Sequence, residues 1–225
     1  MSRISKVRCT PQAQWAAALV AIMTQVSGQT VEAIDGNVFY KDPNERVRQL
    51  TFSKMDADPA LSRDGKSVIF IRRTTRRASF EEPRNNQPVF TQVWVADSEG
   101  RGAHLVFGGP ATDGAFKYAS FSRPNFSPDG RHAYFLIPYA AVVNGLVRLD
   151  LSTHQARVIS SAVTYEVITT GNYAGTLVVL KRKDYSEGAT YSYYLIDAEG
   201  REIGVVGSSE NQARSFAEDP NRHIP

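Results

Sequence analysis

Two short sequences combine an acidic residue with a glycine in a way that could bind a metal ion or a phosphate. They read SRDG and SPDG, and each is followed by a basic residue and an apolar stretch. A calcium loop needs several oxygen ligands within about a dozen residues and closes with a glutamate. Here each aspartate stands alone, and Asp-Gly is a favoured pair in hairpin turns. We therefore expect structural turns without metal or cofactor at Asp64, Gly65, Asp129 and Gly130.

The residue patterns of common hydrolases are absent. The sequence has neither a Gly-x-Ser-x-Gly nor a His-Glu-x-x-His. Its four histidines are scattered, at His104, His132, His154 and His223. We expect no catalytic residue and a protein that is not an enzyme. The many carboxylates leave one alternative open, a carbohydrate-active enzyme that uses a pair of acids.

A basic segment follows the first Asp-Gly sequence, at residues 71–91, which read IRRTTRRASFEEPRNNQPVFT. A cationic cluster beside an aromatic residue suits an acidic protein surface. The alternative is a solvated loop whose arginines pair with its own Glu81 and Glu82. The candidate protein-binding residues in this segment are Arg72, Arg73, Arg76, Arg77 and Phe80.

A second candidate is the aromatic-rich hairpin RKDYSEGATYSYY at residues 182–194. Its tyrosines are either ordinary strand residues with exposed hydroxyls or contacts to a partner. We take Tyr185 and Tyr191 as candidate contacts. Another long connection spans residues 108–124 and contains further aromatic residues.

The elements that would position these residues are short strands. Beyond residue 35, apolar runs with alternation, such as KSVIFIRR and TQVWVAD, are broken by Gly, Asp, Asn and Ser, which is typical of an all-β protein. A second hairpin type recurs, in which an apolar strand ends in aspartate before a polar turn. These aspartates are 55, 53 and 47 residues apart, a period that indicates β-propeller blades: Asp42, Asp97, Asp150 and Asp197.

RQLTFSKMDADPALSRDGKSVIFIRR and RPNFSPDGRHAYFLI resemble the blade repeat of the TolB-like propellers, which also occurs in the propeller domains of prolyl-oligopeptidase-type peptidases. The resemblance covers about residues 37–207, with a weaker third copy in NYAGTLVVL. It implies a partial or small β-propeller of four-stranded antiparallel blades. The repeats amount to one lone hairpin and three two-hairpin units, whereas closed propellers usually have about 4–8 blades. Either the arc stays open, with an edge that a partner or a second copy could cover, or hairpin 37–52 pairs with the last unit and closes a small ring.

The N-terminus predicts export. Residues 1–28 carry Arg3, Lys6 and Arg8, no acidic residue, and the short apolar run WAAALVAIM, which together are typical of a signal peptide. The run is too short for a membrane span, which needs about 20 residues. The alternative is an amphipathic or buried N-terminal helix. Cys9, the single cysteine, lies in this segment, so the exported chain would have no disulfide.

The expected organisation is a signal peptide at 1–28, a propeller domain at 29–207 and a loose polar tail at 208–225. Removing Arg3, Lys6 and Arg8 lowers Lys+Arg from 26 to 23 and leaves Asp+Glu at 23. A neutral mature protein argues against nucleic acid as a partner, and no membrane span is expected.

The leading interpretation is a periplasmic, non-enzymatic module that binds another protein. One version is an inhibitor, such as an immunity protein that inserts a loop into a periplasmic toxin or hydrolase. The other version is a component of a Tol-type envelope assembly.

Overall fold

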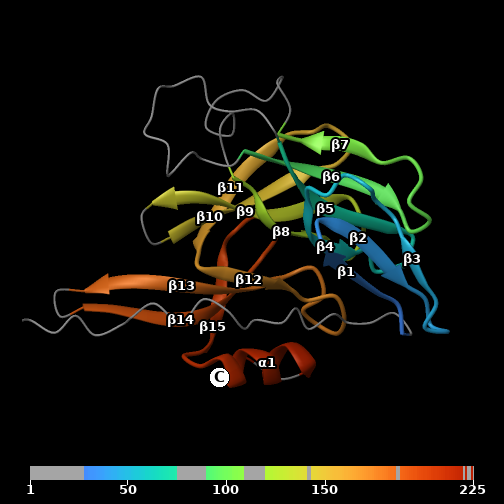
Figure 1. The fold of residues 1–225 in the computed structure, drawn as a ribbon. Coiled ribbons are helices and arrows are strands. Elements are labelled where there is room, and N and C mark those ends of the chain that lie inside the picture. Colours follow the sequence, from blue (N-terminus) through green and yellow to red (C-terminus); the bar gives the residue numbers. More distant parts are fainter. Residues whose placement is uncertain are drawn as a thin grey trace, which may run out of the picture.

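The computed structural model of the chain describes residues 28–74, 90–108, 120–140, 143–185, 188–219, 221 and 224. These residues form fifteen β-strands and one α-helix, and the strands make four separate antiparallel sheets (Figure 1). The structure confirms the all-β class and the partial propeller of antiparallel blades. Each sheet is called a blade below, numbered along the chain.

The first blade has three strands: β1 (Thr30–Ile34), β2 (Asn37–Lys41) and β3 (Val47–Gln49). The second blade has four: β4 (Asp56–Leu61), β5 (Ser67–Arg73), β6 (Thr91–Asp97) and β7 (His104–Phe107). The third blade consists of β8 (Ser122–Phe126), β9 (His132–Ala140), β10 (Val143–Asp150) and β11 (Ala156–Ala162). The fourth blade consists of β12 (Thr164–Val167), β13 (Leu177–Tyr185), β14 (Gly188–Ile196) and β15 (Glu202–Gly207).

The middle strands of the second and third blades are apolar on both faces because these two blades pack between two neighbours. In β5, Val68 and Phe70 belong to the cluster shared with the first blade, and Ile69 and Ile71 to the cluster shared with the third. Successive side chains of a strand point to opposite faces, so a strand buried on both sides needs a continuous apolar run. This requirement explains the sequence SVIFI.

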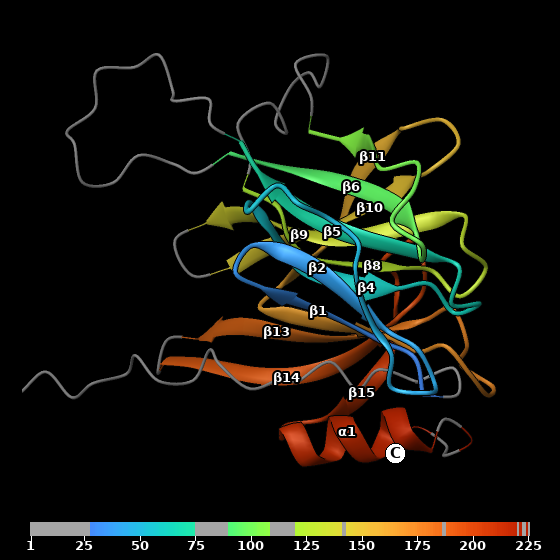
Figure 2. The same ribbon diagram turned by 45° about the vertical axis from the view of Figure 1, so that its right-hand side comes forward.

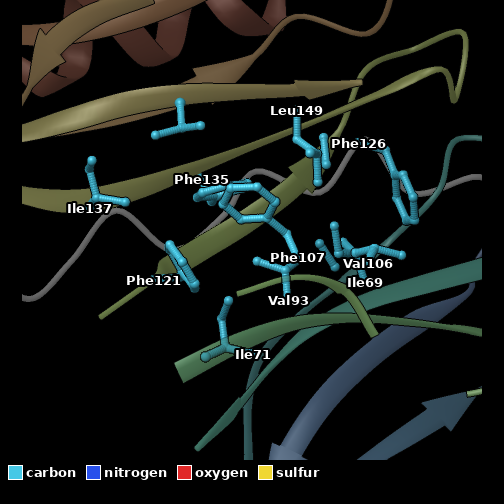
Figure 3. Packing of buried hydrophobic residues seen from close by; sticks show 13 residues of the cluster. Ile69, Ile71, Val93, Val106, Phe107, Phe121, Phe126, Phe135, Ile137 and Leu149 are labelled. Atoms are coloured by element: carbon cyan, nitrogen blue, oxygen red, sulfur yellow. The ribbon is translucent and has the colours of Figure 1, made fainter. Parts of the chain in front are cut away.

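The interface between the second and third blades is the largest buried cluster, and its centre is aromatic (Figure 3). The ring centres of Phe107 and Phe121 lie 5.6 Å apart, and those of Phe121 and Phe135 lie 5.2 Å apart. Such tilted and edge-on contacts stabilise aromatic pairs beyond the area they bury. The two blades are therefore held face to face by packed rings and aliphatic side chains.

The C-terminal segment ends in a helix, α1 (Glu210–Glu218), that covers the far face of the fourth blade. Ala213 and Phe216 are buried there, and the Phe216 ring centre lies 5.4 Å from that of Tyr173. Ser209 and Gln212 form a capping box, in which each side chain accepts a hydrogen bond from the other residue's backbone N–H at the start of the helix. The expectation of a loose tail at 208–225 was therefore wrong for this helix, because two apolar residues on one face suffice to anchor it.

The arc of blades stays open within the described residues. The first and fourth blades share no strand pairing, and no buried cluster joins them. The helix α1 lies where a fifth blade would pack (Figure 1). Of the two arrangements that the repeat count allows, the structure has the open one, and a capping element protects the last apolar face.

Candidate binding face

The two Asp-Gly sequences form equivalent hairpin turns. Asp64 Oδ1 accepts hydrogen bonds from Ser62 Oγ at 2.7 Å and from the Lys66 amide at 3.1 Å. Asp129 Oδ1 accepts from Ser127 Oγ at 2.6 Å in the same way. The serine hydrogen bond is the main reason that the pKa of each aspartate lies below its ordinary value. These carboxylates hold the turns together, and the described residues include no cluster of three or more metal-ligating side chains.

The second type of turn also uses its aspartate internally. Asp97 Oδ1 accepts from the Glu99 and Arg101 amides, at 2.9 and 2.7 Å. Asp197 accepts from the equivalent amides of its own turn, at 3.0 and 2.8 Å. All these turns lie at one end of the blades, which we call the turn face.

The opposite end of the blades is the loop face. It is bordered by the strand ends next to the β1–β2, β5–β6, β9–β10 and β13–β14 connections and next to the links between successive blades. Figure 2 shows the ends of β5, β9 and β13 and the starts of β6 and β14 on the same side. Antiparallel hairpins return the chain to the same end after every second strand, which places the described ends of both candidate segments on this face.

Of the basic segment, the structure describes only Arg72 and Arg73; Arg76, Arg77 and Phe80 lie outside the described residues. Arg72 forms a two-pronged ion pair with Asp56, with Nε–Oδ1 at 2.6 Å and Nη2–Oδ2 at 3.0 Å. Its guanidinium lies 4.3 Å from the Trp94 ring centre. Since the Asp56 side chain is 0% exposed, Arg72 serves the interface between the first and second blades.

Arg73 is exposed and points to the other side of its strand. Its backbone amide donates to the Met55 carbonyl at 2.9 Å, which brings the link between the first two blades beside it. That link contains Phe52, the most exposed large apolar side chain among the described residues, at 78%. Ile34, at the end of β1, is 44% exposed. Sequence reasoning missed Phe52 because it lies in a stretch that reads as an ordinary strand, and it missed Ile34 because the first hairpin was expected only at 37–52, whereas the first blade begins with β1 at Thr30.

The tyrosine hairpin reaches the loop face from the fourth blade. Tyr191 lies opposite Arg182 in the β13–β14 ladder and is 46% exposed. The backbone of Tyr185 closes the hairpin, and its side chain is outside the described part. Arg73 and Tyr191 thus share the loop face but come from different blades, with the third blade between them (Figure 2).

The inner strands carry a polar network that the sequence did not reveal. Asp58 and Arg123 each precede a proline and have positive φ, 49° and 52°, at equivalent irregularities of β4 and β8. The Arg123 amide donates to Asp58 Oδ2 at 3.0 Å, and its guanidinium donates to Thr164 Oγ1 at 2.6 Å. The Tyr165 hydroxyl donates to the Arg123 carbonyl at 2.6 Å. This network links the inner strands of three blades, and burial raises the pKa of Tyr165 well above its ordinary value.

The sequence matches no model of a known protein family, and no curated protein matches it. No helix among the described residues is both long and apolar enough to cross a membrane.

Solved structures do resemble the fold. TolB from Acinetobacter baumannii matches with a TM-score of 0.52 at 14% identity, covering 77% of this chain and 38% of that one. Porphyromonas gingivalis dipeptidyl peptidase 4 matches with a TM-score of 0.54 at 12% identity, covering 81% and 31%. The tricorn protease gives 0.54 at 13% identity, covering 81% and 16%. The chain spans less than half of each of these proteins, and at such identities the likeness shows the fold alone, a TolB-like partial propeller.

Proposed function

We propose that this protein is an exported, non-enzymatic module that binds another protein through its loop face. The observation that carries the proposal is the exposed side chains there, with Arg73 beside the Phe52 link and Tyr191 on the β13–β14 hairpin of the fourth blade. Arginine and aromatic residues are the side chains that contribute most at protein interfaces. On the turn face, the aspartates that the sequence singles out are bound within their own turns.

The rigidity of the scaffold supports a binding role. Arg72 is tied to Asp56 at the base of the basic segment, so the strand ends that carry this segment are fixed. Binding residues are often found on long connections held by a rigid scaffold. We propose that the segment between β5 and β6, with Arg76, Arg77 and Phe80, inserts into an acidic groove of the partner. An inhibitor of a periplasmic toxin or hydrolase, such as an immunity protein, acts in this way.

A Tol-type envelope assembly is the second candidate. It is favoured by the likeness to TolB, which extends over 77% of the chain. Both candidates place the protein in the periplasm, with residues 1–28 as a signal peptide. The basic, acid-free start of the chain, followed by a short apolar run, supports this location.

The test is capture of a partner from a periplasmic extract with the tagged protein, followed by measurement of its affinity. Changing Arg76 and Arg77 together to Glu should weaken binding at least about tenfold, because two attractive contacts become repulsive. The matched control changes Arg63 and Arg131 to Glu, since both are exposed on the turn face. The control should bind like the unaltered protein.

Equal affinity of the two double variants would remove the basic segment from the interface. A captured toxin or hydrolase supports the inhibitor, whereas a captured envelope component supports the assembly. Turnover of a glycan by the purified protein, with no partner retained, would establish the carbohydrate-active alternative instead.

A further inference from the structure

The first blade differs from the others at its inner side. In the other three blades, a strand that runs into the Asp-Gly or equivalent turn forms the inner edge: β4, β8 or β12. In the first blade, the strand order is β1-β2-β3, and Asp42 marks the β2–β3 turn as Asp97 marks the β6–β7 turn. The strand β1 therefore corresponds to β5, and the first blade has no described counterpart of β4.

Within the described residues, no strand pairs with the backbone groups along this inner edge of β1. Ile34 and Asn37 flank the two-residue turn Asp35-Gly36 and are opposite each other in the ladder. The pair of residues that flanks a two-residue turn is hydrogen-bonded through the backbone, and every second pair after it is as well. The backbone groups of Ile34, Glu32 and Thr30 therefore bond to β2. The N–H and C=O groups of Val31 and Ala33 then point away from β2. No other described strand pairs with them.

The side chains around this edge define what it would accept. Val31 is buried in the cluster shared with the second blade, and Ala33, on the same face, is exposed. Glu32 and Asp35 are exposed beside it. An added strand would meet Val31 and Ala33 on one face and the Glu32 carboxylate on the other.

We propose that β1 accepts an extended segment of a partner protein as an antiparallel fourth strand of the first blade. The segment alternates apolar side chains, opposite Val31 and Ala33, with basic side chains near Glu32 and Asp35. Addition of a strand to a sheet edge supplies main-chain hydrogen bonds for affinity and side-chain contacts for specificity. The position is the one that β4 takes in the second blade. The proposal needs none of the loop-face arginines and does not depend on the proposed function.

A second copy of the chain is a poorer occupant. Antiparallel pairing of β1 with itself would place Glu32 opposite Glu32, and like charges in that position destabilise a sheet. A basic partner segment removes this repulsion and pairs the acidic side chains instead.

The experiment uses the full chain and two synthetic peptides of eight residues, one alternating valine with lysine and one alternating valine with glutamate. Amide hydrogen exchange of Val31 and Ala33 is followed together with binding by fluorescence anisotropy. We expect both amides to exchange rapidly in the free protein and slowly with the lysine peptide. The glutamate peptide should bind at least about tenfold more weakly.

Ala33→Pro provides the sharpest variant, because it removes an N–H that points away from β2 and leaves the β1–β2 bonds in place. It should lower the affinity for the lysine peptide at least about tenfold, whereas the matched control Ala33→Val should retain it. Exchange in β2 and β5 shows that both variants remain folded.

Three outcomes overturn the proposal. Equal binding of the two peptides would show that charge does not select the segment. Unchanged affinity of a folded Ala33→Pro protein would show that β1 is not the site. Protection of the Val31 and Ala33 amides in the free protein would show that another part of the chain already occupies the edge.

Discussion

Arg72 and Arg73 are neighbours in the chain with different roles. The strand β5 directs them to opposite faces, so Arg72 meets Asp56 and Trp94 at a blade interface while Arg73 is exposed. A carboxylate that is completely buried is stable only with a well-placed partner. At the scale of the residue, an arginine is therefore structural at one position, and an arginine at the next position is available for binding.

This difference can be measured in the free energy of unfolding. Arg72→Met should destabilise the protein by roughly 3 kcal/mol, because it leaves the Asp56 carboxylate buried without its partner. Arg73→Met, the matched control, should change stability by less than about 0.5 kcal/mol. Urea unfolding of both variants provides the comparison. Equal small effects would mean that water replaces the guanidinium at Asp56.

At the scale of the element, α1 covers the face of the fourth blade on which a fifth blade would pack. It buries Ala213 and Phe216 against Ile168, Val178 and Leu195, a face built like those between blades. Glu166 of β12 lies within this region, and its pKa is raised from 4.5 to about 7. Burial is the main cause, nearby Glu218 adds to it, and Arg214 and Arg123 act in the opposite direction. The packing of the helix thus includes a carboxyl group that favours the protonated form.

The stability of this region should consequently depend on pH. Since the pKa of Glu166 is higher in the folded than in the unfolded protein, folding favours its protonated form. The contribution is complete below about pH 4.5 and is lost as the pH rises through about 7. The difference amounts to at most roughly 3 kcal/mol. Glu166→Gln should flatten the dependence between pH 5 and pH 8 in urea unfolding.

The control for this measurement is Glu45→Gln, which alters an exposed carboxyl group of the first blade. It should keep the pH dependence of the unaltered protein. A Glu166→Gln protein that still loses the same stability between pH 5 and pH 8 would assign the effect to another group.

At the scale of the whole molecule, the open arc makes the four blades unequal. The second and third blades are buried on both faces, whereas the first blade has one neighbour and the fourth has a neighbour and a helix. In such arrays, stability is close to a sum over units and their nearest interfaces. The ends should open before the middle.

Amide hydrogen exchange under native conditions tests this expectation. Protection should be highest in β5, β6, β9 and β10 and lower in β1, β2 and α1, because fewer buried contacts hold the terminal elements. A single opening free energy for all strands would instead show that the arc unfolds as one cooperative unit.

Local sequence was a good guide to the strands and turns. Alternating apolar residues, Asp-Gly pairs and the recurring aspartates predict the hairpins because turn geometry depends on neighbouring residues. The repeat likewise predicts a partial or small propeller, since it reflects the spacing of whole blades. These features depend on interactions within about a dozen residues, as strand and turn signals generally do.

The remaining features needed the three-dimensional arrangement. The Arg72–Asp56 pair joins residues 16 positions apart, and the Arg123–Asp58 bond joins residues 65 apart. The helix α1 gains its place by covering a face that only the assembled fourth blade provides. The edge of β1 is left without a described strand partner because the first blade has no described counterpart of β4. The sequence alone therefore determined the repeating unit, through short-range backbone preferences and apolar alternation. Long-range packing decided which polar groups are buried, which face is capped and which edge is left to bind.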